Sequence, residues 1–207
     1  MTNPSGSNDA ELFRQTLAGD EHAFTELYRR HQAFVYRFAL LMSGSTTIAE
    51  EVVQEVFLAL IRDGHRYDPA RALLSSYLGG IARNHVLRLL ARERNFVPLV
   101  DDADEADAVP PPQLIGPDDP FGNCARNETS RLLRQAVLAL PARYREVVVL
   151  CDFQELSNAD AALMLGCPPG TVNSRLHRGH ALLLKKLREM GSRCAAAEDT
   201  KGMRCFV

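Results

Sequence analysis

Hydrophobic residues recur every three or four positions along two long stretches of this chain, at about residues 9–94 and 126–190. This spacing places them on one face of an α-helix, and neither stretch shows the alternation expected of a half-buried strand. The pattern predicts an all-α fold. The expected helices are 9–18, 20–43, 46–63 and 70–94 in the first stretch, and 126–140, 142–153, 157–165 and 171–190 in the second.

Residues with capping preferences stand at the expected ends of these helices. Asp20 and Thr46 lie where an N-cap side chain would accept backbone hydrogen bonds, and Gly44 and Gly64 lie near helix ends. Pro141 separates the first two helices of the second stretch, where its missing N–H costs little in the first turn.

The segment between the two helical stretches differs in composition. It reads NFVPLVDDADEADAVPPPQLIGPDDPFGN, is rich in Pro and Asp, and has no apolar periodicity. Such a segment cannot form a core of its own. We therefore expect two small helical domains joined by a flexible acidic linker at 96–125, with a disordered N-terminus at 1–8 and a flexible C-terminal tail at 191–207.

The net charge of −2 hides an uneven distribution. Residues 1–95 carry eleven acids and eleven bases, the linker carries seven acids and no base, and residues 126–190 carry ten bases and six acids. Within the last stretch, residues 171–188 hold five bases and no acid. A basic helix of this kind predicts contact with a polyanion.

Other classes of protein are disfavoured by what the sequence lacks. No apolar run reaches the roughly 18 residues of a membrane span, and no secretory signal precedes the first helix. The five cysteines have no CxxC spacing, which disfavours a disulfide framework or a structural zinc site. We find no Gly-rich phosphate loop or nucleophile elbow. The expectation is a cytoplasmic, non-enzymatic protein without catalytic residues, cofactor or metal.

The run LSNADAALMLGCPPGTVNSRLHRGHALLLKKL at 156–187 has the pattern of a helix-turn-helix. Ser157 can cap a short helix, and Gly166 can end it in the left-handed conformation. After the CPPG reversal, Thr171 can cap a longer basic helix. A short helix, a tight turn and a long basic helix form the arrangement with which such motifs read DNA.

Helical geometry gives the second helix of this motif an outward side. Asn173, Ser174, His177 and Arg178 fall there, in the turns that would enter a major groove. We expect Arg178 to pair with a guanine and Asn173 or His177 to reach base edges, while Arg175 is better placed for phosphate. The alternative is a solvated basic face on an ordinary bundle helix, which the turn residues make less favoured.

Helix 46–63 carries an outer face opposite its apolar stripe, formed by Glu51, Gln54, Glu55 and Leu58. One interpretation is an ordinary solvated face with a single exposed Leu. The other is a docking surface for a partner helix with basic and apolar residues.

Helix 70–94 places Tyr77, Asn84 and Arg88 along one edge, where they could stack on unpaired bases and hydrogen-bond to them. Arg83 and Arg92 add positive charge for a phosphate backbone. Taken singly, Tyr77 is also typical of a packed core and Asn84 of an ordinary surface.

Together these segments resemble the extracytoplasmic-function (ECF, group 4) sigma factors of the sigma-70 family. The resemblance rests on DEHAFTELYRRHQAFVYRFAL, AEEVVQEVFLAL and RYDPARALLSSYLGGIARNHVLRLLARER in the first domain. In the second it rests on LLRQAVLALPARYREVVVLCDFQELSNADAALMLGCPPGTVNSRLHRGHALLLKKL. It implies sigma region 2 at 9–95, for polymerase docking and for −10 recognition and melting, and sigma region 4 at 126–190, for −35 recognition.

The resemblance also implies residue roles and partners. The implied −35 contacts are Thr171, Asn173, Ser174, Arg175, His177 and Arg178. The implied −10 contacts are Tyr77, Arg83, Asn84, Arg88 and Arg92. The implied polymerase contacts are Glu51, Gln54, Glu55 and Leu58. The expected partners are core RNA polymerase, through its β′ clamp helices and β subunit, promoter DNA, and an anti-sigma factor, with a monomer when free.

The sequence departs from the family pattern at three places. Tyr77 stands where the family usually has Trp, and Asn173 stands where many members carry Lys or Arg. A tail, SRCAAAEDTKGMRCFV, continues past the expected end and contains Cys194 and Cys205. A regulatory thiol pair and a tail with incidental thiols both stay open, as does a second function, a helix-turn-helix DNA-binding regulator that acts without RNA polymerase.

Overall fold

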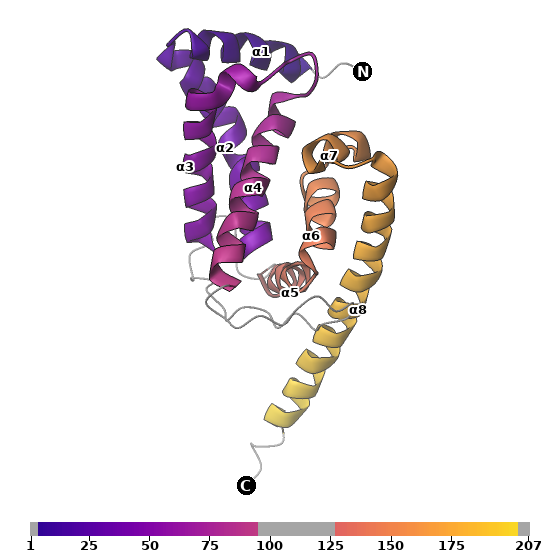
Figure 1. Cartoon of the computed structure of the whole chain (residues 1–207). Coiled ribbons are helices and arrows are strands. Elements are labelled where there is room, and N and C mark those ends of the chain that lie inside the picture. The colour runs from indigo at the N-terminus through magenta and orange to yellow at the C-terminus, as the bar shows by residue number, and fades with distance from the viewer. Residues whose placement is uncertain (1–3, 95–126, 203–207) are drawn as a thin grey trace.

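The computed structural model describes residues 4–94 and 127–202, and in these ranges it is helical without a strand, which confirms the predicted all-α fold. The proposed linker at 96–125 lies outside the described residues. Figure 1 shows two helical units side by side. The first contains α1 (Pro4–Leu17), α2 (Glu21–Ser43), α3 (Thr46–Asp63), the 3₁₀ turn η1 (Gly64–Arg66) and α4 (Leu74–Arg94). The second contains α5 (Asn127–Leu138), α6 (Ala142–Val148), the π-helical turn η2 (Val149–Phe153), α7 (Asn158–Leu165) and α8 (Pro169–Gly202).

The caps of α2 follow the prediction, whereas the N-cap of α3 does not. The Asp20 carboxylate accepts the N–H groups of the first turn of α2, and Gly44 ends this helix at a left-handed φ of 74°. Ser45, not Thr46, caps α3, and its hydroxyl accepts the N–H of Ile48. Gly64 lies at the end of α3, as predicted, with a right-handed φ of −59°, and begins η1.

Several helix ends also differ from the prediction. The N-terminal helix begins at Pro4, five residues before the predicted start at residue 9. The fourth helix begins at Leu74, four residues later than expected. The last helix starts at Pro169 and continues to Gly202, past the predicted end near residue 190. Helix propensity predicts the ends of helices poorly, because the terminal turns depend on tertiary contacts.

The core of the first unit lies between α2, α3 and α4. Phe38 from α2, Val52 and Val56 from α3, and Leu78 and Val86 from α4 are fully buried. These residues follow the helical spacing that the sequence predicted.

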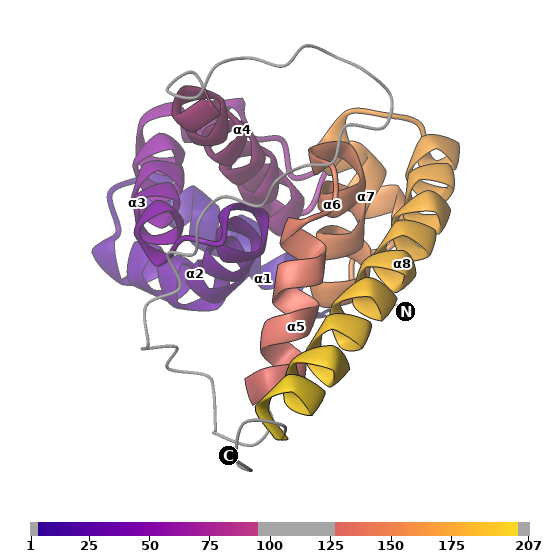
Figure 2. The same ribbon diagram turned by 90° about the horizontal axis from the view of Figure 1, so that it is seen from below.

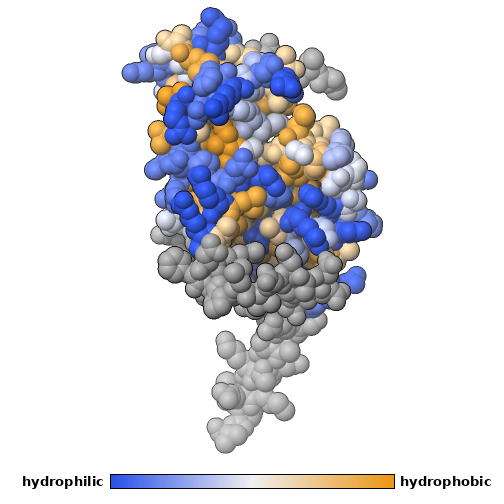
Figure 3. All heavy atoms as spheres, viewed as in Figure 1, coloured by the Kyte–Doolittle hydropathy of each residue, from blue (hydrophilic) through white to orange (hydrophobic). Residues whose placement is uncertain are grey.

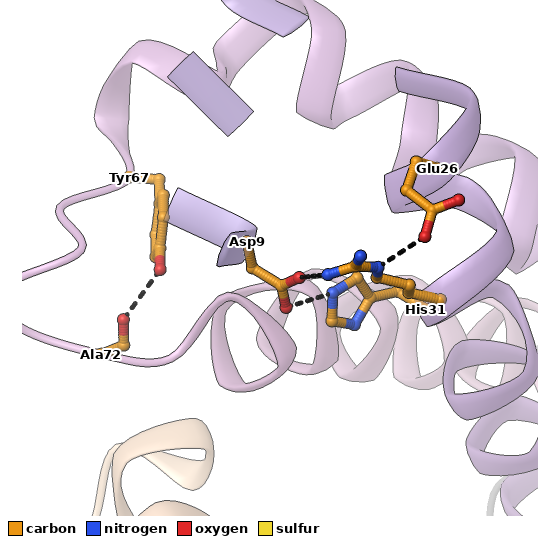
Figure 4. A network of polar contacts seen from close by, with 6 residues as sticks. Asp9, Glu26, His31, Tyr67 and Ala72 are labelled. Atoms are coloured by element: carbon orange, nitrogen blue, oxygen red, sulfur yellow. Dashed lines mark hydrogen bonds and ion pairs between the residues drawn. The ribbon is translucent and has the colours of Figure 1, made fainter. Parts of the chain in front are cut away.

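An ionic network fastens α1 to α2 (Figure 4). The buried carboxylate of Asp9 accepts from Arg30 at 3.0 Å and lies 2.9 Å from Nε2 of His31, while Arg30 also reaches Glu26 at 2.8 Å. Because Asp9 has two partners on α2, it fixes α1 against α2. The same view shows the Tyr67 hydroxyl donating to the Ala72 carbonyl at 3.0 Å, which closes the loop before α4.

The two units pack against each other, which the sequence did not predict. Figure 2 shows α4 on one side and α6 with α7 on the other, and buried residues of both units form one continuous apolar cluster. A Cβ on Gly44, at the end of α2, would lie 2.8 Å from the Leu138 side chain of α5. The Gln154 side chain donates to the Phe34 carbonyl of α2 at 3.3 Å.

The face of the molecule that Figure 3 shows is largely polar. On the face seen in Figure 3, hydrophilic side chains cover most of the area, with smaller apolar patches between them. Among the helices that the structure describes, none is long and apolar enough to cross a membrane.

Candidate nucleic-acid interface

The helix-turn-helix forms as predicted, apart from its second cap. The Ser157 hydroxyl accepts the N–H of Asp160 at 3.1 Å, and Gly166 ends α7 at a left-handed φ of 64°. Thr171 is not a cap, because α8 already begins at Pro169 and the Thr171 N–H donates to the Pro168 carbonyl at 2.9 Å. Proline suits the first helical position, where its fixed φ is helical and no partner for an N–H is needed.

The predicted DNA-reading residues point outward from α8. Asn173, Ser174, His177 and Arg178 are exposed, whereas Val172 on the opposite side is fully buried. Thr171 and Arg175 are half-buried at the edges of this face. The structure therefore brings all six predicted −35 residues onto one end of α8, and four of them are free of core packing.

Two contacts fix α8 against the elements behind it. A Cβ on Gly179 would lie 2.8 Å from Val148 of α6, so glycine allows a close helix approach. On η2, the Asp152 carboxylate lies 2.7 Å from Nε2 of His180. These contacts orient the outward residues on a rigid support, which the sequence pattern did not reveal.

The outer face of α3 is exposed as expected. Glu51 and Gln54 are exposed, Glu55 is half-buried, and Leu58 keeps 56% of its surface accessible. Ile61, one turn further, is equally exposed at 56%. The face thus combines carboxylates with two adjacent exposed apolar side chains.

The edge of α4 is less uniform than predicted. Asn84, Arg88 and Arg92 are exposed, but Tyr77 is half-buried. Its ring packs on Tyr67 with centroids 5.1 Å apart, and burial raises the pKa of its hydroxyl. In this conformation Tyr77 does not share the open edge of the other three.

Two α4 arginines have side-chain partners. Arg83 forms an ion pair with Glu146 of α6, in which Nη2 donates a hydrogen bond of 3.2 Å to one carboxylate oxygen and Nε lies 3.0 Å from the other. Arg88 lies 2.7 Å from Nδ1 of His85, whose pKa is lowered by burial and by the Arg88 charge. Sequence reasoning missed the Arg83 partner because 63 residues separate the pair.

Metal-ligating side chains do not gather in the described part of the chain, where no group of three or more His, Cys, Asp and Glu could hold an ion. Cys151 packs beside the core, and burial raises the pKa of its thiol, which makes it a poor nucleophile at neutral pH. The side chains of Cys194 and Cys205 lie outside the described residues.

Comparisons with known proteins agree with both halves of the fold. The family described as Sigma-70 region 2 matches residues 27–96, and Sigma-70, region 4 matches residues 130–183. The ECF RNA polymerase sigma factor SigM of Mycobacterium tuberculosis is 35% identical over 184 residues, covering 87% of this chain and 85% of that protein. The ECF RNA polymerase sigma factor SigW of Bacillus subtilis is 28% identical over 179 residues, covering 86% and 95%.

Solved structures share the same architecture. CnrH in complex with the cytosolic domain of CnrY superimposes with a TM-score of 0.65 at 26% identity, covering 88% of this chain and 98% of that chain. The sigma factor RpoE, in complex with the anti-sigma factor NepR from Bartonella quintana, gives a TM-score of 0.60 at 20% identity, covering 80% and 96%, which shows a common fold. With both sigma regions matched and a relative of this identity over most of its length, the chain belongs to the ECF RNA polymerase sigma factors of the sigma-70 family.

Proposed function

We propose that this sigma factor, as a group 4 member, directs core RNA polymerase to promoters through three surfaces. These are a −35 surface on α8, a −10 surface on α4 and a docking surface on α3. The observation that carries the proposal is the exposed row Asn173, Ser174, His177 and Arg178 on a capped helix-turn-helix, joined in one chain to an acidic and apolar docking face.

The −35 surface has the chemistry that reads base edges. Arg178 can donate two hydrogen bonds to one guanine in the major groove, and Asn173 can pair with an adenine. Arg175, half-buried at the side of α8, fits a phosphate contact, which adds salt-dependent affinity without sequence information. Thr171 and Ser174 complete the set at the start of the helix.

The −10 surface combines exposed amide and guanidinium groups on α4. Asn84 can hydrogen-bond an unpaired base, while Arg88 and Arg92 can hold the phosphate backbone. Tyr77 would have to leave its packing on Tyr67 before it could stack on a base. Arg83 would have to exchange its carboxylate partner for a phosphate.

The docking surface fits a basic helix such as a clamp helix of the β′ subunit. Glu51, Gln54 and Glu55 supply charge and hydrogen bonds, and Leu58 supplies an exposed apolar anchor. The β subunit would contact region 4, and the factor would act in the cytoplasm as a monomer when free. Because a structural relative is held by an anti-sigma factor, we extend the proposal to sequestration of this chain by such a partner.

Transcription in vitro tests the proposed function. Purified full-length protein is mixed with core polymerase and a library of random promoters, and the initiated transcripts are sequenced. Enrichment of a two-part motif with −35 and −10 elements is expected. A chain that binds DNA as a dimer but neither binds core polymerase nor yields transcripts would instead be a regulator acting alone.

A further inference from the structure

An exposed arginine of α4 is held by a histidine of the same helix. Nη2 of Arg88 lies 2.7 Å from Nδ1 of His85, one turn earlier in α4. A guanidinium stays charged and can only donate hydrogen bonds, so Nδ1 must be the acceptor. The contact therefore assigns the state of the His85 ring, which is neutral and carries its proton on Nε2.

The charged groups around His85 leave this neutral state favoured. Burial lowers the pKa of His85 most, and the charge of Arg88 lowers it further. From α3, the carboxylates of Glu55 and Glu51 raise the pKa, while Arg62 lowers it. Because the net pKa lies below the ordinary value of about 6.5, the ring is mostly neutral at about pH 7 and can accept from Arg88 there.

The contact lies on the edge of α4 that carries the proposed −10 surface. Asn84, the residue before His85, is exposed, and so is Arg88. An arginine side chain has many rotamers, and ordering it on DNA costs conformational entropy. A hydrogen bond from Nη2 to His85 orders the side chain in advance, while other N–H groups of the guanidinium can donate to a phosphate oxygen.

We propose that His85 is a positioning residue of the −10 surface, whose neutral ring orients Arg88 toward the phosphate backbone of single-stranded DNA. The inference rests on the proposed function for the −10 role of α4, whereas the state of the His85 ring does not depend on it.

Acid should break the contact between His85 and Arg88. A proton on Nδ1 removes the acceptor and places a second cation beside the guanidinium. The same proton adds a charge that attracts DNA, so the total affinity for DNA combines two opposing effects. The coupling between the two side chains, obtained from a double-mutant cycle, isolates the positioning effect.

Nitrogen NMR of the full-length protein tests the state of the ring without DNA or polymerase. The His85 signals are identified by their loss in His85→Asn, and at about pH 8 they should show a bare Nδ1 and a protonated Nε2. Arg88→Ala should raise the pH at which the ring is half protonated, because a neighbouring cation is removed. Arg92→Ala, one turn further along α4, is the matched control and should leave that pH unchanged. A proton on Nδ1 at about pH 8, or equal midpoints in wild type and Arg88→Ala, would overturn the contact.

Binding of a fluorescent oligothymidine of about ten nucleotides measures the effect on DNA. At about pH 8, His85→Leu removes the acceptor without changing the charge and should weaken binding by about threefold to tenfold. His85→Asn, which keeps a carbonyl oxygen near the Nδ1 position, should preserve most of the affinity. In an Arg88→Ala background, His85→Leu should have no further effect. At a pH where NMR shows the ring protonated, the coupling between the two positions should disappear.

The outcomes separate this inference from the proposed function. Equal losses from His85→Leu with and without Arg88 would overturn the positioning role, because His85 would then act on its own or through folding. A wild type that does not bind the oligonucleotide, with the ring in the expected state, would count against the −10 role of α4. The presentation of Arg88 to DNA would fall with that role, and the hydrogen bond alone would stand.

Discussion

Gly79 leaves open the space that the Met164 side chain fills, since a Cβ there would approach the Met164 sulfur to 2.6 Å and its methyl group to 2.7 Å. Gly80, the next residue of α4, meets only the Met164 carbonyl oxygen, at an ordinary 3.9 Å. Two adjacent glycines of one helix thus differ in whether they contact the other half of the molecule closely.

This difference predicts unequal effects of the same substitution. Gly79→Ala should stabilise the protein less than Gly80→Ala does, because the added methyl group must displace the flexible end of the Met164 side chain. Gly80→Ala, the control, gains the same helix propensity without the clash. Urea unfolding of the two variants measures the difference. Equal stability would contradict the close fit at Gly79.

Leu58→Asp should weaken binding of core polymerase. Leu58 is 56% exposed, so the charge should leave folding unaffected while removing an apolar anchor from the α3 face. Binding is measured by titrating labelled full-length protein with core polymerase, and a loss of at least about 2 kcal/mol is expected of a hot spot. Leu163→Asp, on an equally open leucine of α7, is the matched control. Parallel losses in both variants would argue against specific docking through α3.

Arg178→Ala should reduce −35 recognition by about 1–3 kcal/mol and relax the preference at one base position. Lys185 is an exposed basic residue two turns further along α8. Lys185→Ala should weaken binding to all DNA sequences alike and lower the salt dependence of that binding. Competition binding with wild-type and single-base-changed −35 duplexes separates the two outcomes. If Arg178→Ala lost the same affinity for every duplex, Arg178 would contact a phosphate and not a base.

Asp9→Asn should loosen α1. Asp9 is buried and satisfies both Arg30 and His31, so the change weakens a paired charge network and should cost about 1–3 kcal/mol of unfolding free energy. Glu11→Gln is the control, because Glu11 pairs with Arg14 on the surface of the same helix and should change stability little. Chemical denaturation compares them, and protease sensitivity reports release of α1. Similar stability of both variants would show that the Asp9 network does not hold α1.

His85 should make stability depend on pH. Its folded-state pKa is lowered, first by burial and then by Arg88, so the unfolded chain binds a proton more readily than the folded chain. Stability should therefore decrease as pH falls below the unfolded histidine value of about 6.5. His85→Gln should remove part of this slope. Unfolding free energies of both proteins between roughly pH 5 and pH 8 test the prediction, and identical slopes would refute it.

Much of the candidate −35 surface could be predicted from the sequence. The outward position of Asn173 and Arg178 follows from their spacing relative to Val172, and the ends of α7 follow from Ser157 and Gly166. The α4 surface was predicted less well. Helical spacing aligned Tyr77 with Asn84, but spacing carries no information about Tyr67, which comes from a different element and covers the ring.

The amino-acid sequence by itself determined the helices, most of their caps and the residues that α8 turns outward, because these features depend on groups within about four positions of each other along the chain. The tertiary structure alone decided that Arg83 faces Glu146, that Gly79 receives Met164 and that the two halves close on each other. These contacts join residues more than sixty positions apart, and no local periodicity encodes which buried face meets which.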